Sequence, residues 1–218
     1  MIPETVIVAG GPDFGLPDLA GLAVSGAEFI GADRGALRLI RAGIRPALAI
    51  GDFDSVTPGE REEIRAASDR FVQVPAEKDE TDTELALLEA AARPARRITL
   101  TGVTGGRLDH AQSALHAVFR LQSEHPDTGF RILDRTNELR FLLPGTSKIK
   151  KSGERPYVSF FAFGGEVEGM DLAGFKYDVT GGRLLPGTTM YTSNELLSEV
   201  CTISFQTGIC LMIRSTDA

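Results

Sequence analysis

Two aspartates stand one residue apart at the end of an apolar run, in the segment AIGDFDSVTPG. If Asp52 and Asp54 were both charged they would repel each other, and one of them would tend to take up a proton. A shared cation removes this conflict. Residues i and i+2 of an extended segment project to the same side, so the two carboxylates can converge on one point. The spacing therefore favours a cation site.

A third carboxylate is available from the segment KDETD, where Asp82 stands at the mouth of a predicted helix. Magnesium prefers hard oxygen ligands and completes its coordination with waters and substrate phosphates. Structural explanations compete, because Asp82 suits the positive end of a helix dipole and Asp52 or Asp54 can cap the turn that follows them. For one aspartate alone the two explanations weigh about equally. The set together favours a Mg²⁺ site formed by Asp52, Asp54 and Asp82.

The segment TGVTGGRLDHAQSAL supplies groups that suit an anion. Gly105 and Gly106 allow the backbone to approach a ligand closely, and the following helix presents free N–H groups. Arg107 can bind phosphate oxygens with both arms of its guanidinium, Lys78 can act as a point charge, and His110 stands at the same edge. The competing explanation is a glycine-rich turn with a solvated arginine. A Walker phosphate-binding loop is absent from the sequence.

Together these groups indicate phosphoryl or pyrophosphoryl transfer from a nucleotide. The acidic residues would hold Mg²⁺, the cation would offset the phosphate charge, and Arg107 would stabilise charge as it develops.

The elements that must position these residues alternate in a regular way over the first 135 residues. Each of six short apolar runs is followed by a turn or a helical pattern. The predicted strands lie at 5–10, 27–32, 47–52, 71–75, 97–102 and 130–134, and the predicted helices near 34–42, 58–68, 82–92 and 109–123. Strands that are apolar throughout are typical of a parallel sheet covered on both faces. Ligands bind beyond the carboxyl ends of such strands, which is where the aspartates fall.

The pattern changes after about residue 136, where short alternating runs are separated by Gly and Pro at short intervals. This pattern is typical of an antiparallel sandwich or barrel. We therefore predict an α/β fold in two domains. The first, 1–135, has a mainly parallel sheet with flanking helices and carries the nucleotide and Mg²⁺ site; the second, 136–218, is an antiparallel β-sandwich.

Composition excludes several classes of protein. The chain has 218 residues, a formal net charge of −7 and a pI near 5.1, which argues against a broad nucleic-acid surface. No apolar stretch approaches the roughly 20 residues that a membrane span requires. Cys201 and Cys210 flank a predicted hairpin turn, and we expect both to be buried thiols of a cytoplasmic protein.

The motifs also carry a family resemblance. GADRGA, GDFDS, KDETDTELAL, TGGRLDHAQSAL, DRTNEL with a following LPG, and TSNEL occur in this order from about residue 5 to 213. The chain resembles the thiamine pyrophosphokinases, which transfer a diphosphate from ATP to the hydroxyl of thiamine and release AMP. The resemblance implies an α/β catalytic domain, a C-terminal β-sandwich that binds thiamine, and a homodimer with the thiamine site at the subunit interface.

The resemblance also implies roles for individual residues. Asp52, Asp54 and Asp82 would bind Mg²⁺, while Asp33, Arg107 and Asp109 would contact ATP or align the reaction. Ser193 and Asn194 of TSNEL would bind thiamine. Asp54 and Asp109 both stay open as the acceptor of the hydroxyl proton.

The chain departs from the family pattern at two points. Arg34 stands in GADRGA where the family often has glycine, and the chain has no tryptophan, on which some members stack the thiamine pyrimidine. Tyr191, just before TSNEL, is a candidate to replace that tryptophan.

Two other functions stay open at this point. One is a sensor that binds thiamine or its diphosphate without catalysis. The other is an enzyme with a different acceptor, either a pterin diphosphokinase or a sugar-nucleotide transferase with a D-x-D motif.

Overall fold

The computed structural model describes residues 3–24 and 26–217. The chain divides into two compact units, Met1–Arg135 (unit 1) and Thr136–Ala218 (unit 2). Each unit has its own buried apolar core. Within the described residues, no helix combines the length and the apolar character that crossing a membrane requires.

Unit 1 contains six parallel strands in the order β6-β5-β1-β2-β3-β4. The strands are β1 (Thr5–Val8), β2 (Glu28–Ala32), β3 (Leu48–Gly51), β4 (Phe71–Gln73), β5 (Arg97–Thr101) and β6 (Gly129–Leu133). All six coincide with the predicted apolar runs, which confirms the parallel sheet. β1 and β3 are buried along their whole length, as expected for strands covered on both faces.

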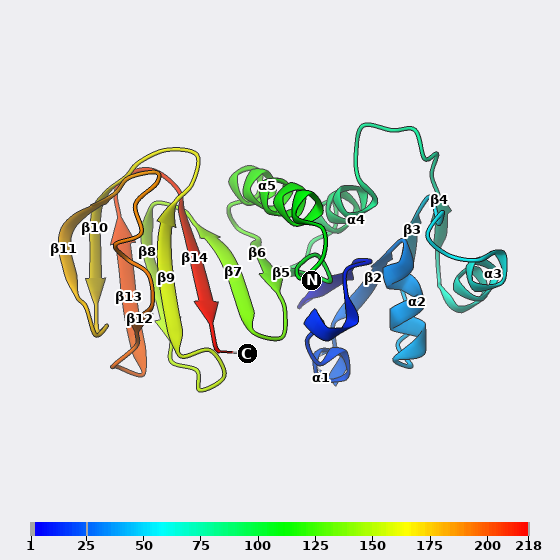
Figure 1. The fold of residues 1–218 in the computed structure, drawn as a ribbon, viewed down its shortest axis with the longest axis horizontal. Helices are drawn as coiled ribbons and strands as arrows, with labels where there is room; N and C mark the ends of the chain where they lie inside the picture. Colours follow the sequence, from blue (N-terminus) through cyan, green and yellow to red (C-terminus); the bar gives the residue numbers. More distant parts are fainter. Residues whose placement is uncertain (1–2, 25, 218) are drawn as a thin grey trace. The chain divides into compact units, whose positions relative to one another are not determined.

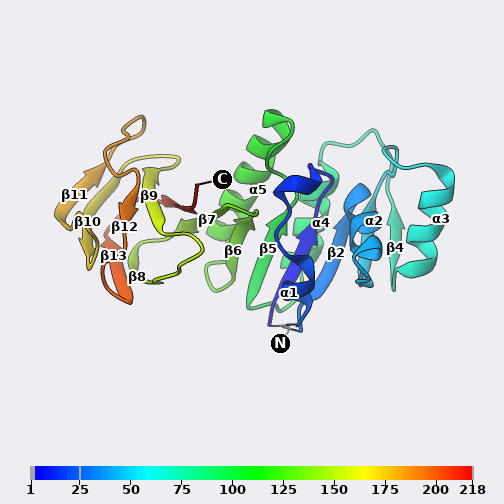
Figure 2. The same ribbon diagram turned by 60° about the horizontal axis from the view of Figure 1, so that its bottom comes forward.

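Helices cover both faces of this sheet (Figure 1). They are α1 (Leu19–Val24), α2 (Arg34–Arg41), α3 (Pro58–Ala67), α4 (Asp82–Ala91) and α5 (Leu108–Glu124), with a short 3₁₀ helix, η1 (Asp13–Gly15). The turned view in Figure 2 shows α1 and α2 on one face and α4 and α5 on the other. The four predicted helices are confirmed. α1 and η1 were not predicted, because both are shorter than two turns and leave little periodicity to detect.

Helix caps explain where α3 and α4 begin. Thr57 and Glu60 form a reciprocal capping box at α3. At α4, Thr81 Oγ1 accepts from the Glu84 backbone N–H at 3.2 Å, but the Glu84 carboxylate accepts from Arg120 at 2.6 Å. Glu84 therefore ties α4 to α5 instead of closing a box with Thr81.

α2 lies against the sheet with almost no separation at Gly35. A Cβ atom built on Gly35 would lie 1.8 Å from the Val8 carbonyl oxygen of β1 and 2.5 Å from its carbon. Both neighbours are backbone, so the contact cannot be relieved by a side-chain rotation. α2 carries Asp33 at its N-cap, so this contact also holds that carboxylate in place.

Gly35→Ala is expected to lower the free energy of unfolding of unit 1 by about 1–3 kcal/mol, the usual cost of overpacking a close contact. Chemical denaturation, followed by circular dichroism, measures the change. Gly59→Ala is the matched control, because a Cβ there meets nothing within 4 Å in helix α3. Equal stabilities of the two variants would contradict the close packing of α2 on β1.

Unit 2 is an antiparallel sandwich, as predicted. One sheet pairs strands in the order β12-β9-β14-β7 and the other in the order β11-β10-β13-β8. The strands are β7 (Asn137–Leu142), β8 (Gly145–Lys150), β9 (Tyr157–Ala162), β10 (Val167–Ala173), β11 (Val179–Leu184), β12 (Asn194–Glu195), β13 (Val200–Phe205) and β14 (Cys210–Ser215). Side chains from both sheets form one core, which includes Cys201 and Cys210 as buried free thiols.

Candidate active site

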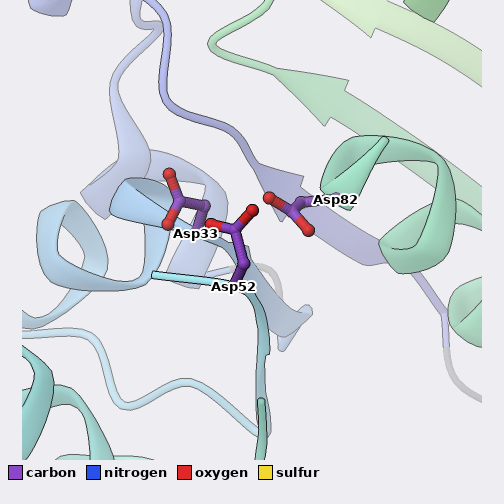
Figure 3. Close-up of side chains that lie close together, drawn as sticks. All are labelled: Asp33, Asp52 and Asp82. Atoms are coloured by element: carbon purple, nitrogen blue, oxygen red, sulfur yellow. The ribbon is translucent and has the colours of Figure 1, made fainter. Parts of the chain in front are cut away.

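Three carboxylates meet at the carboxyl edge of the unit 1 sheet. Asp33 follows β2, Asp52 follows β3, and Asp82 begins α4. One carboxylate oxygen from each lies within 4.8 Å of those of the other two, and Figure 3 shows Asp52 between Asp33 and Asp82 with its carboxylate close to that of Asp82. We call Asp33, Asp52 and Asp82 the carboxylate triad.

The carboxylate triad differs by one member from the group predicted by the sequence. Phe53 has a φ of +59°, so the segment from Asp52 to Asp54 turns instead of running extended, and the i, i+2 argument does not hold. The turn buries the Phe53 ring, which stacks on Phe71 at 4.6 Å. Asp54 is exposed, and its backbone N–H donates to Asp52 Oδ1 at 3.0 Å. Asp33 thus stands in the triad where Asp54 was expected.

Asp54 nevertheless lies close enough to interact electrostatically with the triad. The negative charge of Asp52 is the largest cause that raises the pKa of the Asp54 carboxyl, and Asp82 adds to it. Burial is the largest cause that raises the pKa of Asp82. The structure therefore brings four carboxylates into one electrostatic group, of which three can reach a single ion.

The donor set of the triad suits a hard divalent cation. The Asp33 Oδ1 atom is buried and accepts no hydrogen bond within the described part of the chain, whereas Oδ2 accepts from Ser55 Oγ at 2.6 Å. A buried carboxylate oxygen without a donor is costly unless a cation contacts it. Oxygen ligands in partly buried surroundings are those that Mg²⁺ prefers.

A cavity of about 810 Å³ opens above the triad within unit 1. It falls in the size range of about 300–1,000 Å³ that is typical of small-ligand sites. Its lining also includes basic side chains, namely Arg34, Arg38, Lys78, Arg107 and His110. The cavity therefore combines groups for a cation with groups for an anion, as a metal–nucleotide complex requires.

Arg38 is a cavity residue that the sequence reasoning missed. Its Nη1 donates to the Ala9 carbonyl oxygen at 2.9 Å and its Nε lies 2.7 Å from Asp13 Oδ1. The side chain is only 15% exposed, and burial is the largest cause that lowers its pKa. The sequence could have pointed to Arg38 through its spacing, because it stands four residues after Arg34 on α2 and such residues share one helix face.

The glycine-rich loop before α5 serves packing as well as the cavity. Gly106 lines the cavity, while a Cβ on Gly105 would lie 3.2 Å from the Phe14 ring at a φ of +79°. The loop ends at Arg107, which is 70% exposed and forms a two-pronged ion pair with Asp109. The hydrogen bond from Arg107 lowers the pKa of Asp109 to about 2.

The TSNEL segment of unit 2 is held by internal hydrogen bonds. Ser193 has a φ of +58°, and its backbone N–H donates to Ser159 Oγ at 2.9 Å. Asn194 is buried; its Oδ1 accepts from the backbone of Tyr177 at 3.1 Å and of Glu195 at 2.9 Å, and its Nδ2 donates to the Tyr177 carbonyl at 2.9 Å. The Asn194 amide therefore holds the turn at Tyr177.

The exposed aromatic beside this segment is Tyr177. Its side chain is 62% exposed, whereas Tyr191, the predicted candidate, packs partly buried against the core of unit 2. The Tyr177 turn follows β10 in GFKYD, and nothing in that local pattern separates it from an ordinary hairpin turn. Pairs between Tyr177 and Asn194, Lys176 and Glu195, and Phe175 and Leu196 connect this turn to TSNEL.

Two family models match the chain over separate segments. Residues 23–128 match the catalytic domain of thiamin pyrophosphokinase, and residues 146–210 match its vitamin B1 binding domain. A curated thiamine pyrophosphokinase from Bacillus subtilis is 38% identical over 97% of this chain and 98% of its own length. The chain belongs to the thiamine pyrophosphokinase family.

Solved structures agree with this family assignment. The crystal structure of the Bacillus subtilis thiamine pyrophosphokinase is 37% identical, covers 99% of this chain and 100% of its own, and superposes with a TM-score of 0.91. That of the thiamin pyrophosphokinase from Geobacillus thermodenitrificans is 40% identical, covers 99% and 98%, and has a TM-score of 0.89. The segment that matches the catalytic domain contains the carboxylate triad, and the segment that matches the vitamin B1 binding domain contains TSNEL and Tyr177.

Proposed function

We propose that the cavity of unit 1 binds ATP with Mg²⁺, and that the protein transfers the terminal diphosphate of ATP to the hydroxyl of thiamine and releases AMP. The observation that carries this proposal is the convergence of three carboxylates in a cavity with basic walls, in a chain of this family. ATP, the diphosphate donor, is available in the cytoplasm, and we propose that the enzyme works there.

The carboxylate triad is the proposed Mg²⁺ site, with Asp54 at its margin. Asp33, Asp52 and Asp82 offer the oxygen ligands, and the unpartnered Asp33 Oδ1 supports this assignment. When bound, Mg²⁺ offsets the negative charge of the phosphates.

The basic residues of the cavity would bind and orient the phosphates. Arg107 can turn from Asp109 to phosphate oxygens, because both side chains of this ion pair are exposed. Breaking an exposed ion pair costs little free energy, since water solvates both charges. Gly106 and the N–H groups at the start of α5 would approach the same oxygens. Lys78 and His110 line the cavity beside them.

The reaction is an in-line attack on the β-phosphorus. A bond forms between the thiamine hydroxyl oxygen and this phosphorus as the bond to the oxygen that bridges the α- and β-phosphates breaks, and AMP leaves. Asp54 is the better candidate to accept the hydroxyl proton, because it lies beside Asp52 of the triad, whereas Asp109 is held in the exposed ion pair with Arg107. Positioning and electrostatics would supply most of the acceleration.

Tyr177, Ser193 and Asn194 would form the thiamine side of the site. Asn194 would act by holding the Tyr177 turn, and the exposed Tyr177 ring offers a face to the cationic thiazolium.

We further propose a homodimer with this site at the subunit interface. Large exposed side chains of unit 2 support this proposal, because exposed apolar surface often marks a protein interface. The exposed fraction is 78% for Met190, 64% for Leu197 and 62% for Tyr177. Light scattering coupled to gel filtration measures the assembly.

Tyr177→Ala is expected to raise the KM for thiamine by about tenfold, the loss of roughly 1–2 kcal/mol from one cation–π contact. The KM for ATP should stay unchanged, because Tyr177 belongs to unit 2. Tyr191→Phe is the control, since it keeps the ring that packs on the core and should leave both KM values unchanged. An unchanged thiamine KM in Tyr177→Ala would exclude Tyr177 from the thiamine site.

The direct test is incubation with thiamine, ATP and Mg²⁺, followed by separation of AMP and thiamine diphosphate. Equal amounts of both products are expected. Thiamine binding in calorimetry without AMP would indicate a sensor, and AMP release with a hydroxymethyl pterin but not with thiamine would indicate a different acceptor.

A further inference from the structure

Lys78 places a positive charge inside the carboxylate triad. Its ammonium nitrogen lies 2.9 Å from Asp82 Oδ1 and 3.8 Å from Asp52 Oδ2, and it donates to the Pro75 carbonyl oxygen at 3.1 Å. The Lys78 side chain is only 14% exposed. It lines the same cavity as the triad.

A divalent ion bound to the triad would compete with the Lys78 ammonium for the carboxylates of Asp52 and Asp82. An ion bound by Asp52 and Asp82 would face the Lys78 ammonium at short range, and like charges at this distance repel strongly in a partly buried site. The ammonium group sits at the end of a flexible four-carbon stem, so it can leave the carboxylates without a change of the backbone.

We propose that Lys78 is a positioning residue that neutralises the triad in the nucleotide-free protein and turns to the phosphates when the metal–nucleotide complex enters. This inference rests on the proposed function, because it assigns the metal to the triad and the nucleotide to the cavity. Its consequence is an order of binding: the free protein binds divalent ions weakly, and the metal enters with the nucleotide, whose phosphates give Lys78 a new partner.

The alternative is a lysine that only fastens the loop 75–82 through Pro75 and Asp82. A fastening lysine would affect metal binding in the same direction whether or not nucleotide is present. A neutralising lysine affects the two states in opposite directions, since it competes with the metal in one and helps to bind its complex in the other.

The test is a titration of the full chain with Mn²⁺, a paramagnetic substitute for Mg²⁺, in which the resonance signal of free Mn²⁺ reports binding. It is done without nucleotide and with α,β-methylene ATP, which cannot break at the bond that the reaction cleaves, and Mn²⁺ bound by the same nucleotide without protein is subtracted. Lys78→Met is compared with the wild type, and Lys78→Ala is measured in the same way as a second variant. Lys151→Met is the control for the change in net charge, because Lys151 is an exposed lysine of unit 2.

Without nucleotide, Lys78→Met is expected to lower the dissociation constant of Mn²⁺ by about three- to tenfold, in line with the strength of a partly exposed ion pair. With α,β-methylene ATP, the same variant is expected to raise that constant by about tenfold, since a charge-assisted contact to phosphate is lost. Lys151→Met should change neither value.

A shift in the same direction in both titrations, or no shift in the nucleotide-free protein, would overturn the role of Lys78 while leaving the metal site intact. Wild-type protein that binds no Mn²⁺ even with α,β-methylene ATP would overturn the proposed function itself, and this inference with it. The two failures are therefore distinguishable in one set of curves.

Discussion

An Asp52→Asn protein is expected to retain its fold and to lose at least about a thousandfold of its kcat, the scale of loss when a group that stabilises transition-state charge is removed. Asp82→Asn should behave in the same way. Both residues belong to the carboxylate triad, and an amide oxygen is neutral where a carboxylate brings a full charge to the metal. Release of AMP, measured at saturating thiamine and ATP, gives the rate.

The stability of Asp82→Asn separates a functional from a structural carboxylate. Burial raises the pKa of Asp82 above its ordinary value, so the folded state disfavours the charged form relative to the unfolded state. This charge therefore destabilises the fold at pH 7, and the destabilisation disappears as the pH falls below the unfolded value near 3.8. In the absence of metal, Asp82→Asn should unfold at a temperature equal to or above that of the wild type at pH 7, and the difference should shrink in acid.

Asp79→Asn is the matched control for both measurements. Asp79 belongs to the same KDETD segment and is exposed, so the substitution makes the same chemical change away from the triad. Its activity and unfolding temperature should match those of the wild type. A destabilised Asp82→Asn protein with full activity would show that Asp82 serves the helix start of α4 and not the reaction.

The sequence predicted the sheet of unit 1 well because its signal is local. Strands buried on both faces must be apolar along their whole length, and the runs that contain β1 and β3 have this character. The same reasoning located the candidate site, because carboxyl ends of parallel strands meet at one edge. α1 escaped detection because six residues make fewer than two turns.

The membership of the site was harder to predict, because it depends on backbone turns set by tertiary packing. Phe53 buries its ring against Phe71 and has a positive φ, so the segment is not extended and the Asp54 carboxylate is not among the three that converge. Asp33 also has a positive φ, of +50°, which no pattern in GADRGA reveals. The link between Asn194 and Tyr177 joins residues 17 positions apart, beyond the reach of any local rule.

Asp33→Asn and Asp54→Asn are expected to fail in different ways. Asparagine tolerates a positive φ about as well as aspartate, so Asp33→Asn should fold normally despite the unusual backbone at this position. It removes the charge from the buried, unpartnered Oδ1 and should weaken Mn²⁺ binding, with nucleotide present, by at least about 10–100-fold, the cost already seen for groups that only support metal ligands.

Asp54→Asn should leave Mn²⁺ affinity within about twofold of the wild type, because Asp54 is exposed outside the triad and a solvent-screened charge contributes little. Its kcat should fall by about 10²–10⁴-fold, the usual contribution of a general base.

Loss of metal affinity in Asp54→Asn with normal affinity in Asp33→Asn would restore Asp54 as the third ligand. Weak affinity in both would mean that Asp54 moves into the group when nucleotide binds, so that four carboxylates share the ion. The contrast between affinity and turnover thus assigns one role to each aspartate, since a ligand holds the metal before any reaction begins, whereas a base acts only as the hydroxyl loses its proton.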